Sequence, residues 1–443
     1  MFQKVKGRLY MKWYQLAGGI LAACVLCGCS GGTQEVKQTN KSLTLCEDRL
    51  VNDTYAKGFE EFKKTYPQVE LNVEVYEDLL AGAEQINTQI MAGEGPDLML
   101  MTNYSTSDVY KMMKAQAFAP LDEFMKQDKG WNADLYAKAV LDAGIHEGKQ
   151  MVMPLSYTVK TALTSEENLA AAGISLDDCN NMESFLQEIA KFYDLDDAER
   201  VLGDVGQLAD FPGYLSGQFL DYSKGTLGVD EQILERACTA YRSFYQDDFA
   251  ATSGLMPDTG FPGVGEAIAN GETCMVITFS GNSFMEAAQA VAANASPVLW
   301  PFRNVDGQVC ASVIDYAGIR ANSENKQNAW NLLKILMGDA TQTQIADIGS
   351  YYPVLKPVLE EETDRIREEA YETGKKLVET EPLSQELQEQ YEDAVMNPQK
   401  ALFMTDVCSS KFVSCMRPFY EEGKNYEDCI GEFRKFIKIY LTE

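Results

Sequence analysis

The chain has 443 residues, of which 45% are hydrophobic. A chain of this length is longer than one hydrophobic core usually organises, so we expect two lobes of about 150 to 200 residues each. It carries 67 acidic and 38 basic side chains, a net charge of −29. Such a field repels a phosphate backbone, which excludes nucleic acid as a partner. The charge says little about the ligand, because an acidic surface is usually just a solvated one.

The first residues have the pattern of an export signal. Basic side chains from Lys4 to Lys12 precede an apolar run from Leu16 to Leu26. That run is shorter than the roughly 20 residues of a membrane-spanning helix. We therefore predict a signal peptide over residues 1–28.

The apolar run ends in Leu26-Cys27-Gly28-Cys29, which resembles the lipobox of bacterial lipoproteins. The resemblance implies that Cys29 carries the lipid and that the exported chain is anchored to the outer face of the cytoplasmic membrane. Residues 29–41 are polar and include glycines, a composition typical of a flexible tether. An ordinary cleaved signal peptide is the alternative, and Met11 is an alternative start.

The remaining cysteines do not indicate a metal site. Eleven are present, and removing the signal and lipid cysteines leaves 11 − 3 = 8, with no C-x-x-C pair and a single histidine, His146. We expect no metal and no cofactor. Most of these cysteines should be small buried apolar residues, and whether any form disulfides is open.

From residue 42 onward the hydrophobic pattern alternates between strand and helix periods. Residues 43–46 predict a strand, residues 55–66 a helix, residues 69–75 a strand with one polar face, residues 79–90 a helix, and residues 98–101 a strand buried on both sides. The opening is thus βαβαβ. This alternation predicts an α/β fold in which mainly parallel sheets are covered by helices and receive ligands at the carboxyl ends of their strands.

A second set of elements follows residues 150–154. Helices are predicted around residues 185–192 and 233–244, strands over 273–278 and 312–319, and a helix over 329–336. The region from 360 to 390 is rich in Glu and Lys at helical spacing and predicts exposed helices.

Several short motifs occur in a fixed order, in residues 62–69, 92–98, 117–122, 148–154, 322–330 and 352–354. In this order they resemble the extracellular solute-binding proteins, the family that includes the maltodextrin-binding proteins of ABC importers. Ala117 departs from the glycine usual there, and the last 90 residues match only in being helical.

The resemblance implies a two-lobed fold of the periplasmic-binding-protein type, with a hinge and a ligand cleft between the lobes. One lobe would take residues 42–150 and 305–350, the other residues 151–304 and 351–443. Closure over a ligand would signal to ABC permease subunits in the membrane. We expect a monomer that binds a small solute, a sugar or oligosaccharide by preference, and performs no catalysis.

A sugar needs aromatic surfaces for its apolar faces and planar polar groups for its hydroxyls. Such residues gather at the expected strand ends and lobe crossings. The candidates for ligand binding are Arg49, Asn103, Tyr104, Tyr157, Phe284, Asp315, Tyr316, Tyr351 and Tyr352. For each, a turn, a core position or a solvated charge is the alternative.

Asp315 and Phe284 differ from the other candidates in their sequence context. Asp315 interrupts an apolar strand at the return crossing, where a buried charge demands a partner. Phe284 stands in Ser280–Phe284, where sugar-binding members of the family often carry a turn with a stacking tryptophan, so it would be a substitute.

Other functions stay open. A triad or a His-rich metal site would require His146, while a glycosidase needs only two carboxylates. The same fold also serves surface lipoproteins that sense a solute for a signalling partner. Within transport, the solute could be a polyol, a polyamine, a peptide or a metal chelate in place of a sugar.

Overall fold

The computed structural model describes residues 42–48, 52–76, 79–102, 109–191, 201–202, 219–221, 224–252, 264–271, 273–348, 351–377, 383–403 and 406–442. The predicted signal peptide, Cys29 and the tether lie outside these residues. Within them no helix is both long and apolar enough to cross a membrane.

The first sheet has the strand order β2-β1-β3-β14-β6. Its strands are β1 (Ser42–Asp48), β2 (Glu70–Tyr76), β3 (Leu98–Thr102), β6 (Met153–Pro154) and β14 (Asp315–Ile319). β1 pairs in parallel with both β2 and β3, while β14 runs antiparallel to β3 and β6. Together with two intervening helices, these first three strands confirm the predicted βαβαβ opening.

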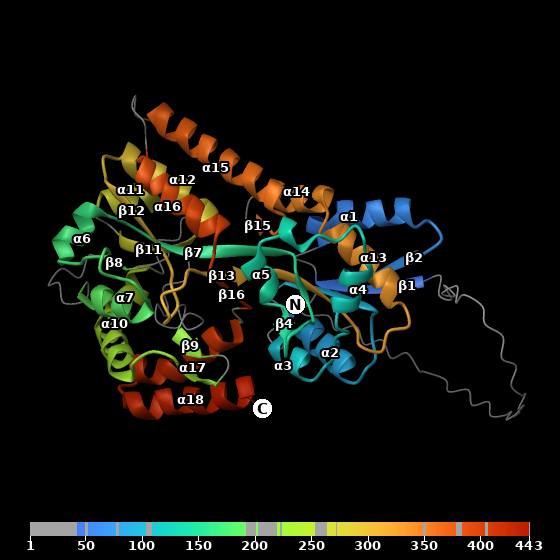
Figure 1. Cartoon of the computed structure of the whole chain (residues 1–443). Helices are drawn as coiled ribbons and strands as arrows, with labels where there is room; N and C mark the ends of the chain where they lie inside the picture. Colours follow the sequence, from blue (N-terminus) through green and yellow to red (C-terminus); the bar gives the residue numbers. More distant parts are fainter. Residues whose placement is uncertain are drawn as a thin grey trace, which may run out of the picture. The chain divides into compact units, whose positions relative to one another are not determined.

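Helices cover both faces of the first sheet (Figure 1). They are α1 (Asn52–Thr65), α13 (Lys326–Leu336) and α14 (Asp339–Ile348) on one face, and α2 (Leu79–Met91) and α3 (Val109–Lys114) on the other. The helix α1 forms where predicted because Tyr55, Phe59 and Phe62 recur at helical spacing and are all buried. Short elements follow α3: α4 (Asp122–Gln127), η1 (Ala133–Leu135), α5 (Lys138–Asp142) and the hairpin β4 (Ile145–His146) with β5 (Lys149–Gln150).

The second sheet is built around one long strand, β7 (Ser156–Ser165). The other strands are β8 (Val201–Leu202), β11 (Thr273–Phe279), β12 (Pro297–Pro301), β13 (Cys310–Val313), β15 (Tyr352–Pro353) and β16 (Lys400–Leu402). The strands β11, β12, β13 and β15 all run antiparallel to β7, and only the pairs β11 with β8 and β13 with β16 are parallel.

The expectation of mainly parallel sheets is therefore wrong for the second sheet. Parallel pairing requires a crossover that brings the chain back in the same direction. Here β11 and β12 run in the direction opposite to β7, so each pairs with it antiparallel.

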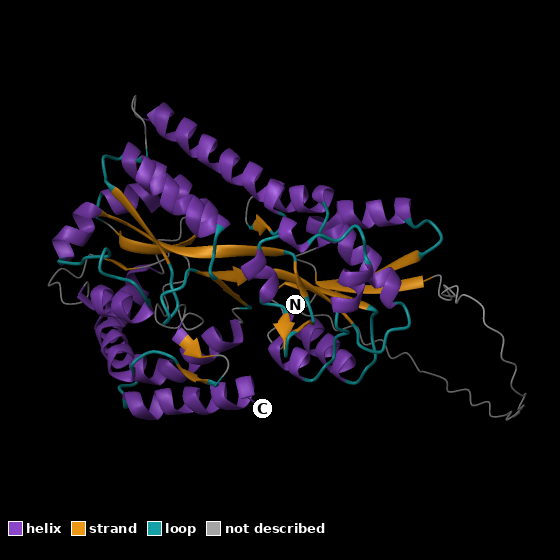
Figure 2. Cartoon of the chain, viewed as in Figure 1, coloured by secondary structure: helices purple, strands orange, loops and turns teal. Residues whose placement is uncertain are grey.

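Helices pack on both faces of the second sheet as well (Figure 2). On one face lie α11 (Val264–Ala269), α12 (Ser280–Ala292), α15 (Lys356–Leu377) and α16 (Gln385–Met396). On the other lie α7 (Met182–Ile189), α10 (Glu231–Thr252), α17 (Asp406–Glu421) and α18 (Tyr426–Thr442), while α6 (Glu166–Ala172) follows β7 directly. A two-stranded ribbon, β9 (Leu220–Asp221) with β10 (Thr226–Leu227), completes this part of the chain.

The predicted strand over residues 312–319 is two strands in different sheets. β13 ends at Val313 in the second sheet, and β14 begins at Asp315 in the first. The chain also changes sheet between Pro154 and Ser156. Although Asp315 interrupts the apolar run, the residues on both sides of this change are buried throughout, so the hydrophobic pattern does not separate the two strands. The predicted ranges of the two lobes stay a prediction.

The motif at Pro96-Asp97 has a structural role. The carboxylate of Asp97 accepts hydrogen bonds from the Thr44 backbone N–H at 3.0 Å, from Ser323 Oγ at 2.7 Å and from Asn325 Nδ2 at 3.0 Å. Arg320 lies 3.6 Å from the same carboxylate. Asp97 thus joins β1 to the segment before α13. This contact links the motif over residues 92–98 to the motif over residues 322–330.

Candidate functional site

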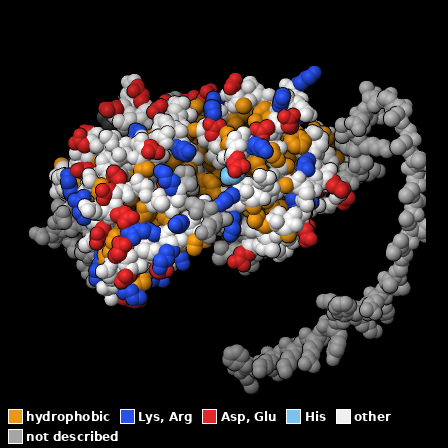
Figure 3. All heavy atoms as spheres, turned by 60° about the horizontal axis from the view of Figure 1, so that its bottom comes forward, with side chains coloured by type: hydrophobic (Ala, Val, Ile, Leu, Met, Phe, Trp, Pro, Cys, Tyr) orange, Lys and Arg blue, Asp and Glu red, His pale blue; other side chains and the backbone are white. Residues whose placement is uncertain are grey.

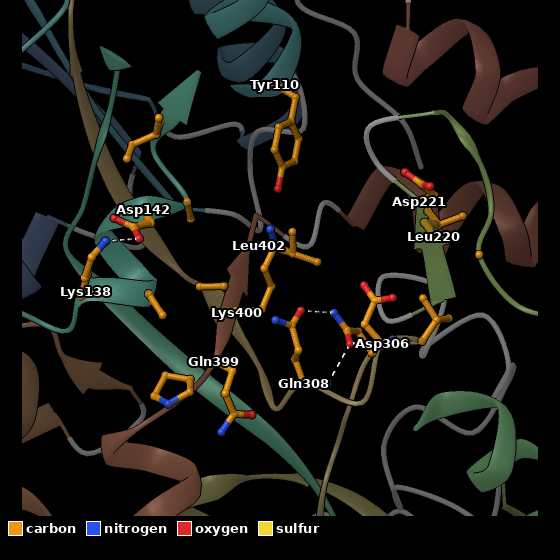
Figure 4. A pocket seen from close by; sticks show the side chains of 18 of the residues that line it. Tyr110, Lys138, Asp142, Leu220, Asp221, Asp306, Gln308, Gln399, Lys400 and Leu402 are labelled. Carbon is orange, nitrogen blue, oxygen red and sulfur yellow. Dashed lines mark hydrogen bonds and ion pairs between the residues drawn. The ribbon is translucent and has the colours of Figure 1, made fainter. Parts of the chain in front are cut away.

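A cavity of about 1220 Å³ lies between segments that belong with the first sheet and segments that belong with the second sheet (Figure 4). One wall comes from α3, α5 and β4, which follow strands of the first sheet. The opposite wall comes from β9, β10, residues 304–308 and residues 396–402. A space bounded by both parts of the chain is the kind of site that a small solute can enter and that closure can seal.

Tyr110 of α3 links the two walls. Its hydroxyl oxygen accepts a hydrogen bond of 3.0 Å from the backbone N–H of Phe403, just beyond β16. The two rings also meet edge to face, with centroids 5.7 Å apart. Burial raises the pKa of the Tyr110 hydroxyl, so the group stays neutral at physiological pH.

The wall from the second sheet is rich in planar amides. Asn304, Gln308, Asn397 and Gln399 all line the cavity. Gln399 Oε1 accepts from the Val309 backbone N–H at 2.6 Å, which fixes residues 396–402 beside the turn before β13. Amides in fixed orientations are groups that can hydrogen-bond a polyhydroxylated ligand.

Lysines and aspartates share the lining, with Lys138, Lys224, Lys356 and Lys400 against Asp142, Asp221 and Asp306. Two of the lysines are neutralised by ion pairs, Lys138 with Asp142 at 2.5 Å and Lys224 with Asp221 at 2.6 Å. In Figure 3 basic and acidic side chains are intermixed over the face that is drawn. His146, expected at a surface turn, is half-buried in β4 and also lines the cavity.

Four of the predicted site residues lie together where the chain changes sheet, namely Tyr157, Asp315, Tyr316 and Tyr352. All four are buried. Asp315 has the partners that a buried carboxylate requires, because it accepts from Tyr55 Oη at 3.0 Å and from Ser156 Oγ at 2.9 Å. Tyr316 packs edge to face on Phe403, with centroids 5.0 Å apart, and so lies one ring behind the cavity wall.

Phe284, the predicted substitute for a stacking tryptophan, is also fully buried. Its ring stacks on Tyr391 of α16 with centroids 4.4 Å apart. The Tyr391 hydroxyl in turn meets the hydroxyl of Tyr352. Tyr157 Oη donates to the carbonyl of Val395 at 2.8 Å, one residue before the cavity-lining segment begins. These aromatic residues therefore hold the end of α16 from behind the cavity.

The other predicted contacts are placed as follows. Arg49, Asn103 and Tyr104 lie outside the described residues. Tyr351 is half-buried immediately before β15. Of the predicted residues that the structure does describe, none is among those lining the cavity.

The cavity-lining segment over residues 396–402 was not predicted from the sequence, in which it lies within an expected helical tail. Its signal was the Asn397-Pro398 pair, which typically ends a helix, followed by Lys400–Leu402. Gln342 was also missed. Its buried side chain donates to the carbonyl of Leu155 at 3.2 Å and accepts from the Val354 N–H at 2.7 Å, and so it ties the segment before β7 to the segment that follows β15.

Comparison with known proteins assigns the class. A profile described as bacterial extracellular solute-binding protein matches residues 57–372, which is more than half of the chain. The chain belongs to this family of substrate-binding proteins. No curated protein sequence matches it.

Solved structures show the same two-lobed fold. The sugar-binding protein MalE from Xanthomonas citri has a TM-score of 0.59 at 14% identity, covering 90% of this chain and 97% of that one. A sugar transporter from Rhizobium etli, in an open conformation, has a TM-score of 0.56 at 18% identity over 90% and 99%. An ABC substrate-binding protein from Listeria monocytogenes, in complex with cycloalternan, has a TM-score of 0.53 at 15% identity over 90% and 98%.

Proposed function

We propose that the protein captures a saccharide in the cavity between its two sheets and delivers it to the permease of an ABC importer. The observation that carries this proposal is the composition of the cavity wall. Elements from both sides of the chain meet there, and the wall from the second sheet presents four amide side chains together with lysines and aspartates.

Size and chemistry both favour an oligosaccharide. A volume of about 1220 Å³ exceeds the several hundred cubic ångströms that a small metabolite needs. Amides and charged groups suit hydroxyls as donors and acceptors, and Tyr110 supplies an aromatic ring on the opposite wall. The sugar-binding neighbours point in the same direction.

The predicted residues Arg49, Asn103, Tyr104 and Tyr351 complete the proposed site as contacts from loops beside the described wall. Tyr157, Phe284, Asp315, Tyr316 and Tyr352 belong to the same proposal, in which they position that wall from behind. No catalytic step is assigned to any of them, and the protein acts as a monomer that needs no cofactor.

Thermal unfolding with a panel of solutes tests this proposal. Neutral and acidic mono- and oligosaccharides, polyols, polyamines and peptides are each added at millimolar concentration to the chain from residue 42 onward. A ligand at a hundred times its dissociation constant adds about 2.7 kcal/mol to the folded state, which is a clear shift in melting temperature. Stabilisation by a polyamine or a peptide alone would refute the saccharide assignment.

The membrane anchor is a separate part of the proposal and rests on Cys29. Cells that express the full chain with a fatty-acid probe should label the protein, and Cys29→Ser should abolish labelling and release the protein from the membrane fraction. Cys46→Ser is the matched control, because this cysteine is buried in β1 and cannot receive a lipid in the folded protein. Unchanged labelling of the Cys29 variant would exclude it as the lipid site.

A further inference from the structure

The cavity has a positive centre that is unusual in so acidic a chain. The whole protein carries a charge of −29, yet the four lysines and three aspartates of the lining sum to 4 − 3 = +1. Lys138 and Lys224 are neutralised by their aspartates. This leaves two lysines, Lys356 and Lys400, against the single carboxylate of Asp306.

Lys356 and Lys400 differ in what they contact. Lys356 Nζ donates to the carbonyl of Asp134 at 3.1 Å, which is a neutral acceptor and leaves the charge uncompensated. The ammonium group of Lys400 makes no hydrogen bond or ion pair within the described part of the chain. Figure 4 shows its side chain in the middle of the cavity, between the Lys138–Asp142 pair and Asp306.

A second donor is fixed next to Lys400 by a short chain of hydrogen bonds. Asn304 Oδ1 accepts from the backbone N–H groups of Asp306 and Gln308, at 3.0 Å each. Because this oxygen is thereby identified, the other end of the amide is the donor. Asn304 Nδ2 accordingly donates to Gln308 Oε1 at 3.1 Å.

The same reasoning sets the orientation of Gln308. Its oxygen is used by Asn304, so its NH₂ group is the end left for a ligand, and among the described residues that group has no acceptor. Gln308 and Lys400 both line the cavity, from neighbouring chain positions, because the Lys400 backbone N–H donates to the Val309 carbonyl at 3.2 Å (Figure 4). An ammonium group and an oriented NH₂ group are both hydrogen-bond donors only. The ligand group that matches them is a hydrogen-bond acceptor that carries a negative charge.

We propose that Lys400 and Gln308 bind an anionic substituent of the solute, so that the substrate class is acidic saccharides, those that bear a carboxylate or a sulfate. This inference rests on the proposed function and narrows it. Asp306 and the two ion pairs keep the rest of the lining close to neutral, which leaves hydroxyl contacts to the remaining amides.

The test measures binding by titration calorimetry at low salt. Oligogalacturonates, oligomannuronates and sulfated disaccharides are compared with neutral malto-, manno-, xylo- and galacto-oligosaccharides, and an oligogalacturonate methyl ester serves as the uncharged partner of the carboxylate ligand. We expect an acidic saccharide to bind, its uncharged counterpart to bind at least tenfold more weakly, and its affinity to fall as salt is raised.

Two variants locate the effect. Lys400→Gln should weaken the acidic ligand by about ten- to a hundredfold, the range for a hydrogen bond to a charged group. Gln308→Glu keeps the shape of the side chain but replaces the donor by a carboxylate, and it should weaken binding at least as much. Lys64→Gln and Gln327→Glu make the same charge changes on exposed positions of α1 and α13 and should leave the affinity unchanged.

The outcomes separate this inference from the proposed function. Binding of neutral saccharides only, or an acidic ligand that binds equally well to Lys400→Gln and Gln308→Glu, would overturn the inference and leave the saccharide receptor standing. Binding of no saccharide at all would refute the receptor, and the inference with it. A carboxylate ligand without a sulfated one, or the reverse, names the substituent.

Discussion

Ser156 and Asp315 are hydrogen-bonded to each other at two of the places where the chain passes between its sheets. Ser156 Oγ donates to the Asp315 carboxylate at 2.9 Å, and the backbone N–H of Asp315 lies 3.1 Å from the same hydroxyl oxygen. The backbones are joined as well, through Leu155 N–H to the Asp315 carbonyl at 2.8 Å and Ile314 N–H to the Ser156 carbonyl at 3.0 Å. The two crossings thus form a single hydrogen-bonded unit, and this unit is where a hinge would bend.

Loss of the tyrosine donor to this unit should destabilise the protein. Tyr55→Phe removes the hydrogen bond of 3.0 Å to the buried carboxylate of Asp315 and should cost about 1.5 to 3 kcal/mol in unfolding free energy, as for other bonds to charged groups. Urea unfolding measures this change. Tyr66→Phe is the control, because Tyr66 is half-buried just past the same helix and its hydroxyl has no hydrogen bond in the described structure. Equal effects of the two substitutions would contradict a role for the Asp315 contact.

The Asp97 carboxylate should matter far more than an exposed one. Asp97→Asn weakens three hydrogen bonds that join β1 to the segment before α13, and we expect a loss of about 2 to 4 kcal/mol in unfolding free energy. The matched substitution Asp347→Asn removes an exposed ion pair with Lys57 at 3.5 Å and should cost below about 1 kcal/mol. Denaturant midpoints of the two variants decide the matter. A larger loss at Asp347 would be the opposite of this expectation.

Asp128 should make stability depend on pH in the acid range. Partial burial opposes its ionisation, but hydrogen bonds from Lys334, Trp330 and the Gly130 N–H outweigh this and lower its pKa. Because the folded pKa is depressed, the stabilisation is complete above the unfolded value of about 4 and is lost as pH falls through the folded pKa. Asp128→Asn should therefore reduce stability at pH 6 and matter progressively less below pH 4.

Unfolding free energies of wild type and Asp128→Asn between pH 2.5 and 7 provide the measurement. Lys334→Gln is the companion variant, since the Lys334 ammonium lies 2.5 Å from the same carboxylate, and it should reproduce part of the effect. A difference between wild type and Asp128→Asn that stays constant down to pH 2.5 would rule out this carboxylate as its origin.

Phe284→Ala separates a core role from ligand stacking. The ring is fully buried against Tyr391, so its removal should cost about 3 to 5 kcal/mol in stability. If the ring only supports α16, the affinity for a bound solute should change less than threefold at a temperature where the variant is folded. A ligand that stacks on Phe284 would instead lose affinity by more than tenfold. Melting temperature and calorimetric affinity, measured on the same sample, distinguish the two.

The buried cysteines should resist alkylation. Among the seven cysteines whose side chains the structure describes, Cys415 is half-buried and the other six are buried. Burial raises the pKa of the Cys179 and Cys310 thiols to about 12, which keeps the reactive thiolate scarce at pH 8. Iodoacetamide labelling followed by peptide mass spectrometry should find Cys415 modified first among the seven. Early modification of Cys310 would show that the second sheet opens more readily than its packing indicates.

Hydrophobic periodicity was sufficient to predict the first strands and helices of the fold. The alternation from β1 to β3 was legible because Val73 and its neighbours alternate with polar residues and because Leu98–Thr102 is apolar throughout. Pattern alone fails where two buried strands of different sheets follow each other almost directly, as on either side of Ile314. It also fails for strand direction, which depends on how β11 and β12 return to β7 and not on their composition.

The candidate site was harder to predict for a related reason. Tyrosines near the crossings were chosen because aromatic rings stack on sugars, yet a buried ring such as Tyr157 has the same sequence signature as an exposed one. The residues that do line the cavity, including Gln308 and Lys400, are ordinary polar residues in short turns and a three-residue strand. Their role depends on which end of the Asn304 amide is the acceptor, and only the three-dimensional structure supplies that information.

The pairing of β16 with β13 has a consequence for the order of assembly. β7 begins at residue 156, and the outermost strand on its β13 side comes from residues 400–402, so that side of the sheet cannot be completed until nearly the whole chain is available. Contacts so distant in sequence form slowly. A protein of an extracellular family has to cross a membrane. Because β16 comes from the last tenth of the 443 residues, the β13 side of the second sheet stays incomplete, and the cavity unformed, until that strand has been synthesised. The order of the strands is then sufficient by itself to delay folding of the second sheet.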